Sequence, residues 1–116
     1  MDRRTTPLAQ AGQDSGTMAQ LIGVLQNSPY PAQREWAATN LSTFDWRMYP
    51  HLTMVLIQAA RQDSAPIVRA AAVYSLSRLN AQTEPVLSTL QTLRSDADPR
   101  VRQEAEQASI RMGLSR

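Results

Sequence analysis

The feature that most constrains this chain is a residue order that repeats at a nearly fixed spacing. Residues 63–79 contain an aspartate, a proline three residues later and a Val-Arg pair, followed by small residues and leucines at helical spacing. Matching positions are Asp96, Pro99 and Arg102 downstream and, in a weaker copy, Pro31 and Arg34 upstream. Pro31, Pro66 and Pro99 are separated by 35 and 33 residues, and the arginines keep the same intervals. This shared register predicts a repeat array, in which each unit stacks on its neighbours to cover its apolar face.

Each repeat is predicted to be a pair of helices. Apolar residues recur at steps of three and four, and prolines stand where first helical turns would begin. The six predicted helices pair as A and B helices at 17–27 with 31–45, 49–62 with 66–80, and 83–94 with 98–113. The expected fold is all-α, an α/α superhelix (right-handed α-solenoid) of about three helix–turn–helix repeats.

The domain boundaries follow from the same pattern. Residues 1–16 are rich in small and polar side chains, so they are expected to form a disordered tail or linker. Residues 17–116 would form one repeat domain, with units at 17–45, 49–80 and 83–113. The last B helix is the richest in charge and has Ser109 where Leu76 stands in the unit before it. A terminal repeat needs a polar outer face, so this helix is predicted to cap the stack.

Residue types needed for several kinds of chemistry are missing or isolated. The chain has no cysteine, which excludes disulfides, thiol catalysis and thiolate metal sites. The single histidine, His51, has no serine or aspartate at a spacing that suggests a triad, and it cannot form a metal cluster alone. The carboxylates fall at turns and helix starts, where capping explains them. We therefore expect a protein without catalytic residues, metal or cofactor.

The charge distribution argues against nucleic acid as the main partner. All 12 basic residues are arginine, which explains the high isoelectric point, but 10 acidic residues are interspersed among them and the net charge is only +2. The chain has no long apolar run and no signal-peptide pattern, so a cytoplasmic location is expected and no membrane partner.

Two segments identify a resemblance to a known family. Residues 63–72, DSAPIVRAAA, and 96–105, DADPRVRQEA, share an Asp-x-x-Pro-x-Val-Arg-x-x-Ala core that resembles HEAT repeats. The closest variety is the shorter one of bacterial and archaeal proteins and of bilin-lyase accessory proteins. The first unit departs from the pattern, with Ser28 in the aspartate position and Gln33 in the valine position.

The resemblance implies roles for the repeated charged residues. In HEAT repeats the turn aspartate and the B-helix arginine form a ladder of hydrogen bonds between neighbouring units. By resemblance the members of this ladder are Asp63, Arg69, Asp96 and Arg102. The arginines outside this motif are expected to be freer, and Arg61 with Arg94 could line a stripe beside the turns. These arginines are Arg34, Arg61, Arg78, Arg94 and Arg111.

The best candidates for partner binding are aromatic residues and one arginine. The loop between the first two units concentrates Trp46, Arg47 and Tyr49, and interfaces favour aromatics with arginine. The competing interpretation is that this loop's aromatics plug the junction beside the irregular first unit. Trp36 and Tyr74, on predicted B helices, complete the candidate set, and the same alternative applies to them.

The leading hypothesis is a non-catalytic scaffold module that binds another protein, or a further segment of a longer parent chain, through its concave B-helix face and inter-repeat loops. Two alternatives remain: a nucleic-acid-binding domain resembling HEAT-like DNA glycosylases, and an accessory subunit resembling a bilin lyase. Three units are near the minimum for a stable stack, so marginal stability or self-association is expected.

Overall fold

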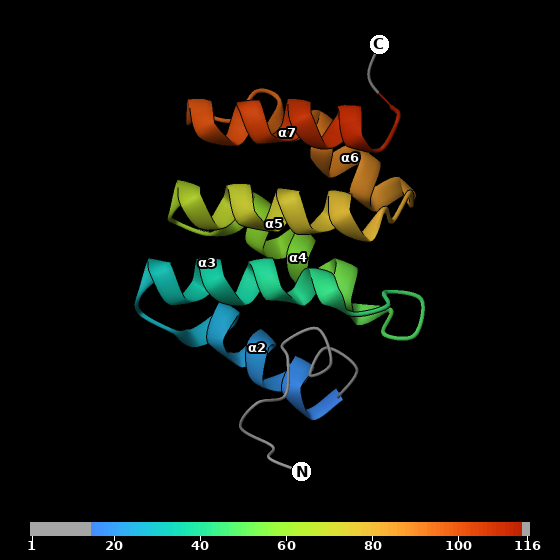
Figure 1. The fold of residues 1–116 in the computed structure, drawn as a ribbon. Helices are drawn as coiled ribbons and strands as arrows, with labels where there is room; N and C mark the ends of the chain where they lie inside the picture. Colours follow the sequence, from blue (N-terminus) through green and yellow to red (C-terminus); the bar gives the residue numbers. More distant parts are fainter. Residues whose placement is uncertain (1–14, 115–116) are drawn as a thin grey trace.

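The computed structural model describes residues 15–114, which form six α-helices and one short 3-10 helix (Figure 1). The elements in chain order are α2 (Ser15–Asn27), α3 (Pro31–Asn40), η2 (Leu41–Thr43), α4 (His51–Gln62), α5 (Pro66–Leu79), α6 (Glu84–Leu93) and α7 (Pro99–Arg111). No strand occurs in this part of the chain. The first unit comprises α2 and α3, the second α4 and α5, and the third α6 and α7.

The helices form two layers. In Figure 1, α3, α5 and α7 lie side by side in front, and α2, α4 and α6 lie behind them. Helix α5 packs against α3, α4 and α7, so the second unit is held from both sides. The predicted fold class is confirmed: the chain is all-helical, with six helices packed in pairs as a solenoid of three units.

Proline and the residue before it explain why the B helices begin where they do. Pro31, Pro66 and Pro99 each stand in the first turn of their helix, where a missing N–H leaves no helical bond unmade. The residue before each of them has an extended backbone, as the proline ring requires. At α7 the Asp98 side chain adds a cap by accepting a 2.8 Å hydrogen bond from the Arg100 backbone N–H.

The first unit differs from the prediction at both ends. Helix α2 begins at Ser15, so residues 15 and 16 are helical and not part of a tail, whereas residues 1–14 lie outside the described residues. The B helix of the first unit was predicted to reach residue 45, but α3 ends at Asn40 and only the η2 turn continues it. Local hydroxyls explain the early end: Ser42 donates to the Thr39 carbonyl and Thr43 to that of Asn40.

The interior is aliphatic and follows the repeat register. Val68 and Val101, the valines of the two clear motifs, have no exposed surface. Leu41 and Leu76 are also fully buried, and Ser109 in the equivalent slot of α7 is 5% exposed. The units therefore share a common core pattern, and only the last substitutes a small polar residue at this position.

The end of α5 offers a local test of backbone conformation. Asn80 has a left-handed backbone (φ 53°, ψ 40°), which glycine adopts freely, asparagine tolerates and β-branched residues avoid. Asn80→Val is expected to destabilise the protein by about 1–2 kcal/mol. The control is Asn80→Gly, which should change the free energy of unfolding by less than about 1 kcal/mol. Urea unfolding followed by circular dichroism measures both, and equal effects would contradict this interpretation.

Candidate functional site

Arginine–aspartate pairs connect the three units. Arg34 of α3 donates from Nε and Nη2 to the two carboxylate oxygens of Asp63, both at 3.0 Å. Arg69 of α5 donates in the same way to Asp96, at 3.2 and 3.0 Å. The four side chains are only 9–14% exposed. Each pair is therefore a two-pronged contact, largely shielded from water, that joins one unit to the turn of the next.

Each ladder arginine is also fixed by its own turn. Nη1 of Arg34, Arg69 and Arg102 donates to the backbone carbonyls of Ser28, Asp63 and Asp96, at 3.0, 2.9 and 2.8 Å. This contact needs only a carbonyl, so it survives where the turn has serine in place of aspartate. It positions Nε and Nη2 to face the following unit.

The aspartates combine the contact between units with a turn of their own. Asp63 accepts from the Ala65 N–H and Asp96 from the Asp98 N–H, both at 2.9 Å. Burial acts to raise the pKa of Asp96, but the hydrogen bonds from Arg69 and from the Asp98 backbone outweigh it, so this pKa lies below its ordinary value. For Arg34, the hydrogen bond to Asp63 raises the guanidinium pKa. Both shifts favour the charged forms.

The expectation that Arg34 is freer is wrong, because Arg34 binds Asp63. The first unit lacks a turn aspartate, but Arg34 reaches forward to the aspartate of the second unit. The missing group at Ser28 is thus irrelevant to the arginine of the same unit. The signal was present in the sequence, since Arg34 lies 35 residues before Arg69.

Three of the other arginines expected to be freer also have polar partners. Arg61 donates from Nε to the Thr89 hydroxyl at 3.0 Å, and Arg94 to Glu106 at 2.9 Å. Arg111 donates to the Ser77 hydroxyl at 3.0 Å and to Glu104. Arg78 lies over the Tyr74 ring, 6.0 Å from its centroid. Arg61 and Arg111 thus contact a neighbouring unit, whereas Arg94 and Arg78 have partners within their own unit.

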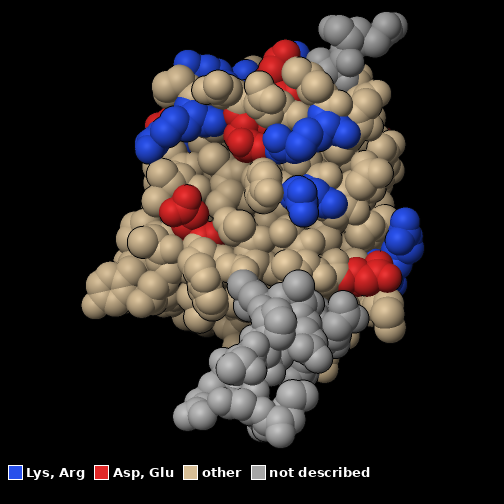
Figure 2. Space-filling view, viewed as in Figure 1, with Lys and Arg blue, Asp and Glu red and all other residues tan. Residues whose placement is uncertain are grey.

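The layer formed by α3, α5 and α7, here called the B-helix face, presents a shallow groove. The groove has a volume of about 340 Å³. It is lined by Glu35, Thr39, Ile67, Ala70, Ala71, Tyr74, Arg100 and Glu104. Figure 2 shows this face: charged side chains of both signs gather over its upper part, and the remainder is mostly uncharged. The groove therefore has an apolar floor and a mixed-charge rim.

Two candidate aromatics lie on this face. Tyr74 lines the groove and lies beside two guanidinium groups, those of Arg78 and Arg111, the second at 5.2 Å from the ring centroid. Trp36 is 51% exposed and occupies in α3 the slot that Ala71 holds in α5, 35 residues later. Trp36 itself does not line the groove, but it directly follows Glu35, which with Thr39 forms the α3 part of the lining.

The loop between the first two units has a mixed character. Trp46 and Tyr49 pack partly buried against the core, and Tyr49 meets the Phe44 ring edge to face at 6.1 Å. The Trp46 indole Nε1 is buried with no hydrogen-bond partner among the described residues. Arg47 covers the Trp46 ring at 5.5 Å, but its own side chain is 75% exposed. Trp46 and Tyr49 thus occupy the junction, and Arg47 is the part of the loop that a partner could reach.

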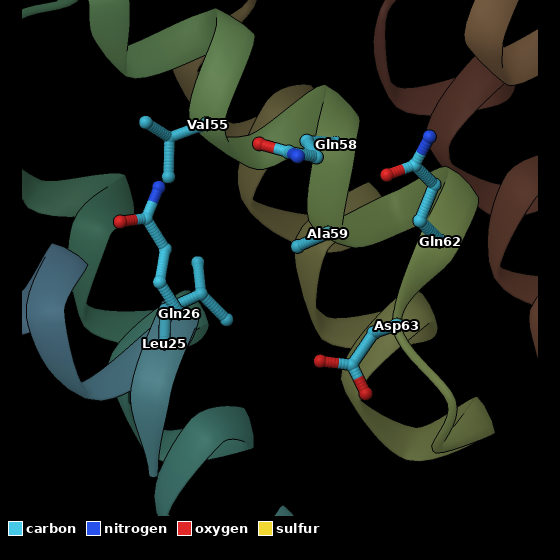
Figure 3. A pocket seen from close by; sticks show the side chains of 7 residues that line it. All are labelled: Leu25, Gln26, Val55, Gln58, Ala59, Gln62 and Asp63. Atoms are coloured by element: carbon cyan, nitrogen blue, oxygen red, sulfur yellow. The ribbon is translucent and has the colours of Figure 1, made fainter.

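The opposite layer contains a second hollow, between α2 and α4 (Figure 3). It is lined by Leu25, Gln26, Val55, Gln58, Ala59, Gln62 and Asp63. Its only charged group is Asp63, which Arg34 already binds, while its three glutamines come from the two helices. Such a lining offers amide hydrogen bonds but neither a nucleophile nor a base.

The remaining candidates for chemistry are dispersed. His51 is exposed at the start of α4, beside Met54 and Gln58. Across residues 15–114, no three His, Cys, Asp or Glu side chains gather closely enough to hold a metal ion. None of the helices within that range is long and apolar enough to cross a bilayer.

The paired helices and the ladder define an α-solenoid repeat protein. A family model described as HEAT repeats matches residues 18–110, and the chain belongs to this family, as its motifs predicted. HEAT repeats commonly mediate protein binding. No curated protein and no solved structure gives a significant match to the chain.

Proposed function

We propose that this protein is a non-catalytic interaction module that binds another protein through its B-helix face, with Arg47 of the inter-unit loop as a further contact. The observation that carries the proposal is the groove across α3, α5 and α7, which Tyr74 lines, together with the exposed Trp36 on α3. Large aromatics next to arginine dominate the energetics of protein interfaces. Their position on neighbouring helices of one rigid layer supports binding with little reorganisation.

The chemistry of the groove favours a peptide segment as the bound element. Ile67, Ala70 and Ala71 provide a floor for apolar side chains. Glu35, Arg100 and Glu104 give the lining charges of both signs, which suit mixed polar side chains better than a polyanion. Within residues 15–114, intramolecular hydrogen bonds already engage most of the arginines that a duplex would need.

The test uses peptides selected against the intact chain from a random displayed library. Trp36→Ala and Tyr74→Ala are each expected to weaken binding of the selected peptide at least about tenfold, because each removes an aromatic anchor. Met54→Ala, which changes an exposed side chain on the other layer, should leave the affinity unchanged. Isothermal titration calorimetry measures the affinities.

Two outcomes would contradict the proposal. One is that selected peptides bind equally well to both aromatic variants. The other is that a short DNA duplex binds more tightly than any peptide and loses affinity steeply between two salt concentrations, as phosphate contacts do. Arg47→Ala tests the loop separately from the B-helix face. A moderate loss of peptide affinity in this variant would show that the loop is part of the interface.

A further inference from the structure

The B helices carry equivalent rows of residues that differ in one respect, namely whether another unit covers them. Each row consists of three positions four residues apart: Arg34 and Ala38 on α3 with Ser42 on η2, Arg69, Val73 and Ser77 on α5, and Arg102, Glu106 and Ile110 on α7. Residues at this spacing share one side of a helix. A following unit covers the first two rows, whereas no unit within residues 15–114 covers the third.

Contacts on the first two rows are made by the following unit. Arg34 and Arg69 bind Asp63 and Asp96. On α3, the Ala38 carbonyl accepts a buried 2.6 Å hydrogen bond from Ser75 of α5. On α5, Val73 has no exposed surface, and Ser77 accepts a hydrogen bond from Arg111 of α7. Each of these two rows is therefore a surface on which the following helix–turn–helix unit packs.

The third row has the same arginine in the same setting without the partner. Arg102 donates from Nη1 to the Asp96 and Ala97 carbonyls, as Arg69 does to its own turn. Its Nε and Nη2, the atoms that bind aspartate in the other two units, have no partner among the described residues. Ile110, eight residues further along the row, is 54% exposed, although its counterpart Ser77 is buried.

We propose that this row is a docking surface for a helix–turn–helix segment of a partner protein, whose turn carries an aspartate that Arg102 binds in two-pronged fashion. The expected partner is a carboxylate, because Nε and Nη2 of Arg102 correspond to the atoms with which Arg34 and Arg69 bind Asp63 and Asp96. Glu106, held by Arg94, replaces the apolar Val73, so the surface is more polar than the two covered rows. Such a polar composition is typical of a transient protein–protein interface.

A second copy of this chain does not fit the site in the same way. Stacking head to tail would bring the turn of a first unit to Arg102, and that turn has Ser28 where an aspartate is needed. The Ser28 hydroxyl is occupied locally, donating to Gln33 and accepting from the Tyr30 N–H. An occupant that reproduces the internal pairs must therefore differ from the first unit of this chain and carry an acidic turn followed by a helix.

The probe for this site is a synthetic peptide with the sequence of residues 83–114, which contains Asp96 in the required turn. Added to the isotopically labelled full chain, it should shift the NMR signal of the Arg102 Nε–H group. Replacing Asp96 by Asn in the peptide, or Arg102→Gln in the chain, should weaken binding about ten- to hundredfold, the range for a charge-assisted pair. The control is Arg61→Gln, because Arg61 lies on α4 in the other layer, donates to Thr89 and should not affect binding.

A tandem variant guards against a peptide that does not fold alone. A second copy of residues 83–114 placed after Ser115 puts the copied aspartate 33 residues after Asp96, the natural interval of the last two units. We expect amide protons of the added unit to exchange slowly, and Arg102→Gln to raise their exchange rates about tenfold or more. Exchange as fast as in an unstructured peptide, or no effect of Arg102→Gln, would overturn the proposal. So would a shift at Arg69 instead of Arg102, which would mean that the peptide displaces the third unit.

Discussion

Leu76→Ala is expected to destabilise the protein by about 2–5 kcal/mol, the largest effect of any single substitution considered for this chain. Leu76 has no exposed surface and lies on α5, which packs against α3, α4 and α7. Truncation would leave a cavity between the units, and neighbouring helices held by the ladder cannot close it fully. Because small domains are stable by only about 5–15 kcal/mol, this loss is a large share of the total. Urea unfolding followed by circular dichroism gives the change.

A matched control comes from the exposed side of the stack. Met54→Ala removes a similar volume from α4, but Met54 is 59% exposed and alanine is a good helix former, so the expected change is below about 0.5 kcal/mol. A loss below 1 kcal/mol for Leu76→Ala would show that Leu76 is not a core residue, and the repeat register would need revision.

Most of the fold could be predicted from the sequence because several residue types recur at the same interval. Prolines located the starts of the B helices, and valines and leucines at equal intervals located the core. The end of α3 was missed because side-chain hydroxyls of Ser42 and Thr43 compete with the helix, an effect that periodicity does not reveal.

The ladder was partly readable for a related reason. Its members at the clear motifs were named by resemblance, but Arg34 was grouped with the arginines expected to be freer. The pairing runs from each arginine to the next unit, which a comparison within one unit cannot reveal. The exposed state of Trp36 was also beyond prediction, since a tryptophan on an amphipathic helix is compatible with the core as well as the surface.

Asp96→Asn is expected to cost about 2–4 kcal/mol, because it leaves Arg69 charged and largely buried with only part of its hydrogen bonding. The Arg69 and Asp96 side chains are 14% and 11% exposed, so water cannot replace the lost carboxylate fully. An amide also presents a donor where the second guanidinium N–H needs an acceptor. The control is Glu106→Gln, whose partner Arg94 is 41% exposed, and for which we expect less than about 1 kcal/mol. Urea unfolding at pH 7 measures both.

The pH dependence gives the same prediction a second readout. The pKa of Asp96 is lowered in the folded protein, so its contribution is fully present above the unfolded value near 4 and is lost as pH falls through the lower folded value. The stability difference between the natural chain and Asp96→Asn should therefore shrink when unfolding is measured below about pH 3 instead of at pH 7. A difference that stays constant would mean that the substitution acts through shape and not through the charge.

Replacing both partners of one arginine–aspartate pair tests whether the two side chains act together to couple neighbouring units. Replacing Arg69 and Asp96 together by leucine removes the need to bury charge, so the double variant should lose clearly less than the sum of the two single variants. Asp96 also accepts from the Asp98 N–H, and losing that turn contact should leave a residual cost of about 1 kcal/mol. If the double variant instead loses the full sum, the two side chains act independently and the pair does not couple the second and third units. Strong coupling would mean that Arg69 recognises the turn of the next unit, the property on which the proposal for Arg102 rests.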